Sequence, residues 1–389
     1  MSQATLEISP SIATKTTVWY TRCPVPTAFG VALRSGSLHE EFAGDSDVVL
    51  RSVLDSGDPA VHDSHYTGNL RNAFRQGGNI PPIWARSRGA DTKVVGLSWT
   101  TAPAVVLVPS DSAIRSVADL KGKKLLIVRR PDEVIDFLYA GTLHTYEAVL
   151  ATAGLRLDDV ILVEKVVKGS TEHTKPSAQG AGAIQNRPRF SAGVHRNTLL
   201  PLLNREVDAI VAQGPSAVEL VEGFEVRVVY DLSSHPDPIA RFHNSVPKVL
   251  TVNAGFLNER PDLVTRVLAR LLEAADWAKA NTEQAVHFVA LEQGASDGLI
   301  EATYGPKLAG ELELNFSPEN IERLAAQKAF LLRHRFIEKD FDLKQWFDEA
   351  PLKAARALLT GRLADGSSLH DRTSRPQPNI GPAGCVVSR

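Results

Sequence analysis

The sequence predicts an α/β fold built on a largely parallel sheet, because short strand-like runs alternate with helix-like segments along the chain. The strand-like runs are rich in β-branched and aromatic residues, and the helix-like segments repeat apolar residues at helical spacing. The length of 389 residues leaves room for about two to three average domains, and the 43% hydrophobic content is enough to form their cores.

Two sets of elements follow each other in the chain. In the first set we expect strands at 16–20, 47–54, 92–99 and 104–109, and helices at 24–36, 67–76 and 81–88. In the second set we expect strands at 123–128, 159–167, 207–212 and 225–230, and helices at 132–154 and near 197–204. Long amphipathic helices then follow at 261–281 and 318–336, each beginning at a proline that a first helical turn tolerates. We expect the helix at 261–281 to pack in the core and the polar stretch 170–193 to form a long loop.

Charge and composition point to a small-molecule partner. The formal net charge is −2, with no basic stripe for nucleic acid and no apolar run long enough to span a membrane. The N-terminus lacks a basic start followed by an apolar stretch, so we expect a cytoplasmic protein, and we expect it to be a monomer. Cys23 and Cys385 are far apart in the sequence, which predicts that Cys23 is a free thiol.

Two longer segments resemble periplasmic-type solute-binding folds. "VVLVPSDSAIRSVADLKGKKLLIV" is similar to the crossing between the lobes of such proteins, and "VLTVNAGFLNERPDLVTRVLARLLEAADWAKAN" is similar to the return into the first lobe. The resemblance implies two α/β lobes with a ligand cleft between them. Lobe I would hold residues 1–108 plus 235–364, lobe II residues 109–234, and 365–389 would be a flexible tail.

A more specific resemblance is carried by "CPVPTAF" and "SHYTGNLRNAFRQGGNIPP", which are similar to the aryl sulfinate desulfinases. In that family a cysteine stands in Cys-Pro-Val-Pro, a histidine stands ten residues before an arginine, and a glycine pair leads into Ile-Pro-Pro. The corresponding residues here are Cys23, His65, Arg75, Gly77 and Gly78. The resemblance implies a hydrolase that splits the carbon–sulfur bond of an aromatic sulfinate without a cofactor, giving the arene and sulfite.

The substrate-binding residues that we predict are Arg75, Gly77, Gly78 and Thr21. A sulfinate is a small anion on an apolar ring, and the planar guanidinium of Arg75 can pair with two of its oxygens. Backbone N–H groups of the glycine pair, just before a helix that starts with proline, would add neutral donors. Thr21 replaces a serine found two residues before the cysteine in a familiar member of the family, and keeps the hydroxyl.

The catalytic residues that we predict are Cys23 and His65. Cleavage of the bond needs a proton at the ring carbon that carries sulfur, which Cys23 can deliver while His65 sets or restores that proton. In a second route the thiolate of Cys23 attacks sulfur and water resolves the adduct. The residue types are compatible with both routes and do not distinguish them.

Other interpretations of the same residues stay open. Cys23 can be a packed core thiol, His62 can replace His65, Arg71 can replace Arg75 one helical turn earlier, and the glycine pair can end a helix. The competing functions are a non-catalytic binding protein for sulfonates or related small anions, which needs export, and a thiamine-pyrimidine synthase, whose cysteine-rich run is absent. We expect no metal site, because no cluster of histidine, cysteine and carboxylate has ligand spacing.

Overall fold

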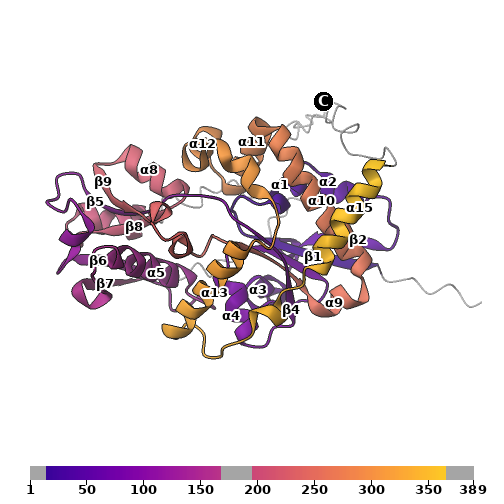
Figure 1. The fold of residues 1–389 in the computed structure, drawn as a ribbon, viewed down its shortest axis with the longest axis horizontal. Coiled ribbons are helices and arrows are strands. Elements are labelled where there is room, and N and C mark those ends of the chain that lie inside the picture. The colour runs from indigo at the N-terminus through magenta and orange to yellow at the C-terminus, as the bar shows by residue number, and fades with distance from the viewer. Residues whose placement is uncertain (1–14, 168–194, 365–389) are drawn as a thin grey trace, which may run out of the picture.

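The strands of the chain form two lobes, each with its own β-sheets, in a computed structural model that describes residues 15–167 and 195–364 (Figure 1). Lobe I contains a five-stranded sheet in the order β2-β1-β3-β10-β4, and lobe II contains a sheet in the order β8-β5-β9 and the pair β6-β7. Cys385, the tail predicted for 365–389 and the loop predicted for 170–193 lie outside the described residues. No helix within the described ranges has the length and apolar character needed to cross a membrane.

The strands of lobe I are β1 (Thr16–Arg22), β2 (Val48–Ser52), β3 (Ala73–Gly77), β4 (Thr92–Ser98) and β10 (Lys248–Asn253). Its helices are α1 (Ala28–Arg34), α2 (Ser37–Phe42), α3 (Pro59–Thr67), α4 (Ile80–Ser87), α9 (Ala254–Glu259), α10 (Pro261–Ala280), α11 (Thr282–Gln293), α12 (Asp297–Tyr304), α13 (Pro318–Arg333), α14 (Leu343–Trp346) and α15 (Ala350–Ala364). Lobe II has the strands β5 (Ala104–Pro109), β6 (Lys124–Arg129), β7 (Ile161–Val166), β8 (Ile210–Gln213) and β9 (Val226–Asp231), with the helices α5 (Phe137–Ala151), α7 (Leu200–Leu203) and α8 (Pro215–Gly223).

Strand direction agrees only in part with the predicted parallel sheet. β1 pairs in parallel with β2 and β3, and β6 pairs in parallel with β7. β10 runs antiparallel to both of its neighbours, β3 and β4, and β5 runs antiparallel to β8 and β9. β10 and β5 follow the segments that carry the chain between the lobes, so they enter their sheets from the opposite end.

The boundary between the lobes differs from the predicted one at residue 108. Because β5 pairs with β8 and β9, its residues 104–109 belong to lobe II, and lobe I ends before Ala104. The two connections between the lobes are therefore residues 99–103 and 232–247. The apolar run "AVVLVP" indicates a buried strand correctly, but a run that is apolar on both faces fits either sheet.

The predicted helix at 67–76 is wrong. Helix α3 ends at Thr67, where Gly68 takes the left-handed conformation, and Asn72 also has a positive φ before the chain enters β3. The strand itself reads "AFRQG" and has no β-branched residue, so its local pattern does not indicate a strand. Pairing with β1 on one side and β10 on the other makes it one.

The sheet of lobe I has a mainly apolar face, which also carries Arg22 and Gln76 at the strand ends, and a second face that carries the predicted site residues. Val18 and Tyr20 of β1 point into a core that includes α1 and α10, and α10 buries ten of its side chains, as predicted for the helix at 261–281. Successive residues of a strand point to opposite faces. Thr21 therefore lies on the other face, which α3 and α4 cover.

An ion-pair cluster holds the end of β1 against α11. The carboxylate of Glu292 accepts hydrogen bonds from Arg22 Nε at 2.5 Å and from Arg34 Nε at 2.6 Å, and its side chain is only 5% exposed. Arg22, although it is next to Cys23 in the sequence, thus binds a carboxylate in the core of lobe I.

We expect Glu292→Gln to lower the free energy of unfolding by about 3–5 kcal/mol, because it leaves two largely buried guanidinium groups without their shared charge partner. Urea denaturation at neutral pH measures this. Glu259→Gln is the matched control, since the Arg71–Glu259 pair is more than half exposed on both sides, and we expect it to cost about 0–1 kcal/mol. Equal costs for the two variants would contradict the prediction.

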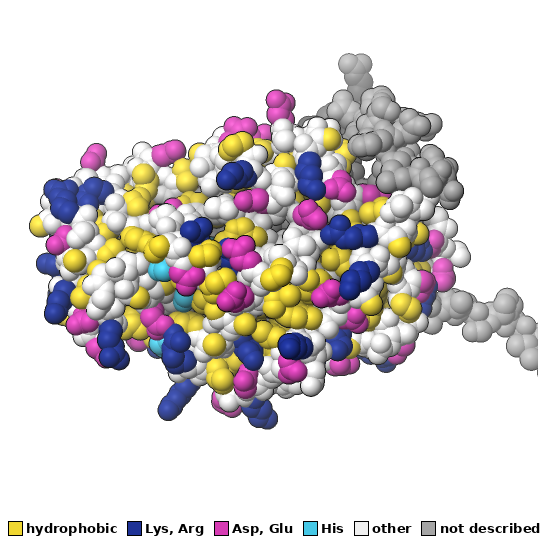
Figure 2. Space-filling view, in the orientation of Figure 1, with side chains coloured by type: hydrophobic (Ala, Val, Ile, Leu, Met, Phe, Trp, Pro, Cys, Tyr) yellow, Lys and Arg dark blue, Asp and Glu magenta, His cyan; other side chains and the backbone are white. Residues whose placement is uncertain are grey.

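Charged side chains of both signs are mixed over the surface shown in Figure 2, which fits the formal net charge of −2. Lysine and arginine side chains lie among aspartate and glutamate side chains over most of this face. We therefore expect buried arginines, rather than this surface, to provide the positive charge that binds a small ligand.

Candidate active site

Cys23 follows β1 directly, at the carboxyl end of the strand. Its N–H donates to Gln76 O of β3 at 3.0 Å, which extends the strand pairing by one residue. Two prolines at 24 and 26 then separate the strand from α1, whose first turn is capped by Thr27 Oγ1 accepting from Gly30 N at 3.0 Å. Cys23 is a free thiol, as predicted, and is half-buried at the strand end, so it is not a packed core thiol.

The pairing of β1 with β3 gathers the predicted residues on one face of the sheet. Thr21 pairs with Arg75, and Cys23 and Gly77 each follow two residues later on the same face. Helix α3, which precedes β3, lies over this face and brings His65 in its last turn to Cys23. Four of the six predicted site residues thus lie in two strands and one helix, and the other two, Cys23 and Gly78, directly follow β1 and β3.

His65 connects Thr21 and Cys23. Its Nε2 lies 3.5 Å from Cys23 Sγ, and its Nδ1 lies 2.7 Å from Thr21 Oγ1. The ring of Tyr66 meets the His65 ring edge-on, with centroids 4.9 Å apart. The Thr21 hydroxyl, predicted to bind substrate, contacts His65, which is the arrangement of a residue that positions the ring.

Arg75 is almost fully buried beneath the thiol, with 5% of its surface exposed. Its Nε donates to His65 O at 2.8 Å, its Nη1 to Gly78 O at 2.9 Å, and its Nη2 to Cys23 Sγ at 3.7 Å. Each terminal nitrogen carries two hydrogens, so one N–H remains on each of them for an anion. Burial lowers the pKa of Arg75, and ionised Cys23 and Tyr66 oppose that shift.

Gly77 gives the thiol its space. A Cβ at this position would lie 2.3 Å from Cys23 Sγ and 2.7 Å from Cys23 Cβ, far inside contact distance. The interpretation of the glycine pair as a helix C-cap is wrong, because Gly77 ends a strand. Its lack of a side chain lets Cys23 pack directly over the neighbouring backbone.

Gly78 is in contact with Asn244, a residue that the sequence did not single out. A Cβ on Gly78 would lie 2.7 Å from Asn244 O and 2.8 Å from both Asn244 side-chain polar atoms. Asn244 O also accepts from Asn79 N at 2.8 Å, and its Oδ1 accepts from Ile80 N at 3.2 Å. Asn244 acts here through both its main-chain oxygen and its side-chain Oδ1, and it is too far from Gly78 in the sequence for a local pattern to show the contact.

The predicted anion site at the start of α4 therefore has fewer free backbone N–H donors than expected. Asn244 takes two of its N–H groups, and the next two helical positions are prolines 81 and 82, which have none. The Gly78 N–H has no acceptor within the described part of the chain, so it remains as a backbone donor.

The alternative residues lie elsewhere. His62 Nε2 contacts Ser56 O at 2.6 Å, and Arg71, with its side chain 71% exposed, pairs with Glu259. His65 and Arg75 are the members of each pair that contact Cys23.

We expect Thr21→Val to lower kcat about five- to tenfold with little change in KM, because His65 loses a hydrogen bond worth roughly 1 kcal/mol while the anion donors remain. Steady-state rates across pH measure this, and the limb of the pH profile that reports His65 should shift. Thr21→Ser should restore the wild-type profile. A Thr21→Val enzyme with an unchanged kcat and pH profile would argue against the positioning role.

The chain is similar over most of its length to known desulfinases. It is 26% identical over 358 residues to 2′-hydroxybiphenyl-2-sulfinate desulfinase of Rhodococcus erythropolis. The alignment covers 86% of this chain and 92% of the relative, and the enzyme of Rhodococcus qingshengii gives the same values. The "NMT1/THI5 like" family model matches residues 77–184.

Solved structures show the fold to be that of the periplasmic binding proteins, as the sequence predicted. The desulfurization enzyme DszB superposes with a TM-score of 0.69 at 23% identity, covering 89% of this chain and 100% of that one. A cysteine-to-serine mutant of DszB in complex with biphenyl-2-sulfinic acid superposes with a TM-score of 0.68 at 24% identity, covering 88% of this chain and 99% of that one. The periplasmic aliphatic sulphonate binding protein SsuA of Escherichia coli superposes with a TM-score of 0.60 at 18% identity, covering 85% of this chain and 91% of that one.

Proposed function

We propose that this protein is a desulfinase that cleaves the carbon–sulfur bond of an aromatic sulfinate and releases the arene and sulfite without a cofactor. The substrate is 2′-hydroxybiphenyl-2-sulfinate or a similar aryl sulfinate, in line with the relatives that match most of the chain. The catalytic residues are Cys23 and His65, and the sulfinate binds to Arg75 and to the Gly78 N–H.

The observation that carries this proposal is the environment of the Cys23 sulfur. Two nitrogen atoms face Sγ, His65 Nε2 at 3.5 Å and the donor Arg75 Nη2 at 3.7 Å. No carboxylate in the described ranges pairs with Arg75, so its buried positive charge lacks a fixed counter-ion. An anion held beside the thiol supplies that charge, and positive charge there also stabilises a thiolate once a proton has left.

In the first route, the Cys23 thiol protonates the ring carbon that carries sulfur, and the electrons of the carbon–sulfur bond form the new carbon–hydrogen bond. Sulfur dioxide leaves and adds water to give hydrogen sulfite and a proton, and His65 returns a proton to the thiolate. In the second route, the thiolate bonds to sulfur and the aryl group leaves with a proton from His65. Water then splits the sulfur–sulfur bond, giving hydrogen sulfite and the free thiol.

The second candidate function is non-catalytic binding of a sulfonate. It is favoured by the similarity in fold to SsuA, a sulphonate binding protein. A binding protein has no need for a histidine in contact with a cysteine beside the anion site, so the contact between His65 and Cys23 favours the enzyme.

Purified full-length protein, freed of metal by chelation, should release sulfite from 2-(2-hydroxyphenyl)benzenesulfinate and from related aryl sulfinates. Sulfite and the arene should form in equal amounts, and alkanesulfonates should not react. The absence of sulfite across a panel of aryl sulfinates, together with tight binding of an alkanesulfonate, would establish the binding protein instead.

The proposal includes a cytoplasmic monomer. Fractionation of the native host and sedimentation of the purified protein test the two parts separately.

A further inference from the structure

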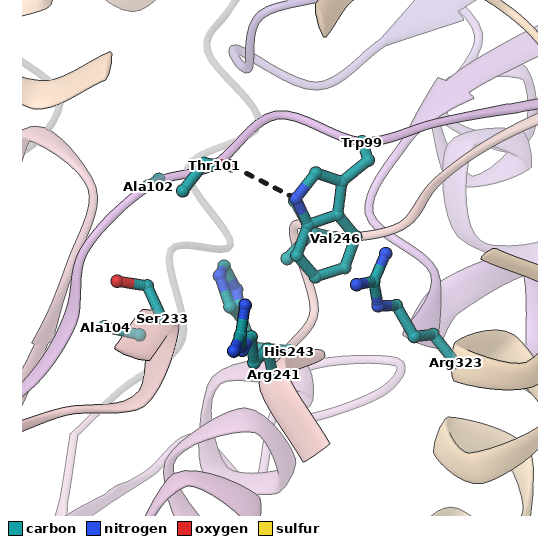
Figure 3. A pocket seen from close by; sticks show the side chains of 9 residues that line it. All are labelled: Trp99, Thr101, Ala102, Ala104, Ser233, Arg241, His243, Val246 and Arg323. Carbon is teal, nitrogen blue, oxygen red and sulfur yellow. Dashed lines mark hydrogen bonds between the residues drawn. The ribbon is translucent and has the colours of Figure 1, made fainter. Parts of the chain in front are cut away.

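A small pocket lies where the two connections between the lobes run beside α13 (Figure 3). Trp99 and Thr101 line it from the first connection, Ser233, Arg241 and His243 from the second, and Arg323 from α13. Its volume is about 50 Å³, several times what one water molecule needs, so it has room for an ion of a few atoms. None of these residues belongs to the candidate active site.

Two guanidinium groups line the pocket. Arg323 is 6% exposed and lies over the Trp99 ring, with Cζ 3.7 Å from the ring centroid. Burial lowers the pKa of Arg323, Glu319 raises it, and the charge of Arg241 lowers it, so the two arginines repel each other. Arg241 Nε donates to His235 O at 2.7 Å, and within the described ranges no carboxylate pairs with Arg241.

His243 adds a neutral donor. Ser245 N–H donates to its Nδ1 at 3.2 Å, which places the ring proton on Nε2. Nε2 is buried and has no acceptor among the residues that the structure describes. Burial lowers the pKa of His243 to about 3, with the charge of Lys248 adding to the shift, so the ring is neutral at pH 7. A buried N–H donor without a partner costs free energy that a ligand oxygen would recover.

The carboxylates near the pocket already accept hydrogen bonds from protein groups. Asp231 accepts from Ala104 N and from Ser233 Oγ, and Glu311 accepts from Thr101 N and Thr101 Oγ1. Glu319 pairs with Arg323 and is 52% exposed. The groups left to a ligand are therefore donors, which excludes a cation and favours an anion with several oxygens.

We propose that this pocket binds a small inorganic oxyanion of the sulfite, sulfate or phosphate class. The ion would accept hydrogen bonds from Arg241, from Arg323 and from His243 Nε2, and would connect both interlobe connections to α13. Asn244, which holds the start of α4 beside Gly78, directly follows His243, so the bound ion and the candidate active site share one short segment. That sulfite is the natural occupant rests on the proposed function, whereas the oxyanion site does not.

Titration of the full-length protein with sodium sulfate, sulfite and phosphate at constant ionic strength tests the site, with calorimetry and tryptophan fluorescence as readouts. Trp99 touches Arg323, so binding should change the fluorescence, and Trp99→Phe should remove that change but keep the heat of binding. Which of the three ions binds most tightly identifies the source.

Arg241→Gln should raise the dissociation constant about tenfold or more, because it removes a charged donor. Arg241→Lys should give a smaller rise, and a normal melting temperature checks that each variant folds. Arg71→Gln, which changes an exposed arginine far along the sequence, should leave the constant unchanged.

Equal affinity in wild type and Arg241→Gln, or no binding of any of the three ions at millimolar concentration, would overturn the site. The assay involves no turnover, so its outcome is separate from that of the proposed function. Oxyanion binding without sulfite release from aryl sulfinates would overturn the proposed desulfinase function and support the oxyanion site. Sulfite release without oxyanion binding would support the function and overturn the site.

Discussion

Replacing Cys23 with serine is expected to lower sulfite release from an aryl sulfinate by about 10²- to 10⁴-fold, the range over which one positioned acid or base acts. A serine hydroxyl is a far weaker acid and nucleophile than a thiol, and it does not supply the thiolate that His65 and Arg75 face. Binding of the sulfinate should change little, because the remaining N–H groups of Arg75 and that of Gly78 are untouched. Initial rates of sulfite release and calorimetric binding to the variant measure the two effects.

The second cysteine provides the control for this change. The chain has two cysteines, and Cys385→Ser should leave the rate as it is in the wild type. A Cys23→Ser enzyme that keeps a tenth or more of the activity would rule out both routes. Rapid quenching followed by mass spectrometry separates the routes, since only attack of the thiolate on sulfur leaves Cys23 heavier by one sulfur dioxide.

The second large effect is expected for Gly77→Ala, which should lower kcat by at least about 10²-fold. The added methyl carbon would lie 2.3 Å from Cys23 Sγ, so the thiol must rotate or shift away from His65 Nε2 and Arg75 Nη2. A displacement of about 1 Å at a reacting group is enough for a loss of this size.

Gly57→Ala is the matched control for Gly77→Ala. Gly57 has an ordinary φ, and a Cβ there would meet nothing within 4 Å, so kcat should not change. Thermal melting of both variants separates loss of the thiol position from loss of the fold. A Gly77→Ala enzyme with wild-type kcat would show that Cys23 need not stay where the structure places it.

Much of the candidate site was predictable from the sequence because it depends on strand ends. Cys23 follows a run that is clearly a strand, and the spacing from His65 to Arg75 and the glycine pair identified the partners, which the pairing of β1 with β3 brings together. The resemblance supplied that spacing, since the predicted helix at 67–76 would have put Arg75 on a helix. Local pattern failed there because "AFRQG" becomes a strand only through its two neighbours.

The rest was not predictable for physical reasons. The role of Thr21 depends on where the His65 ring lies, which only the packing of α3 decides. Asn244 comes from a segment more than 160 residues after Gly78 in the chain, and its contacts through the main-chain oxygen and the side-chain Oδ1 depend on how the second interlobe connection packs. The lobe to which β5 belongs depends on which sheet pairs with it, and an apolar run carries no such information.

Lobe II has the topology of an inserted domain. The chain leaves lobe I after β4 and returns through β10, and the two ends of the insertion meet where Ala104 N–H donates to Asp231. Domains with adjacent termini are readily exchanged between host proteins. Since Cys23, His65, Arg75 and Gly78 all precede the insertion, a chimera that carries lobe II of another homologue would keep these groups together.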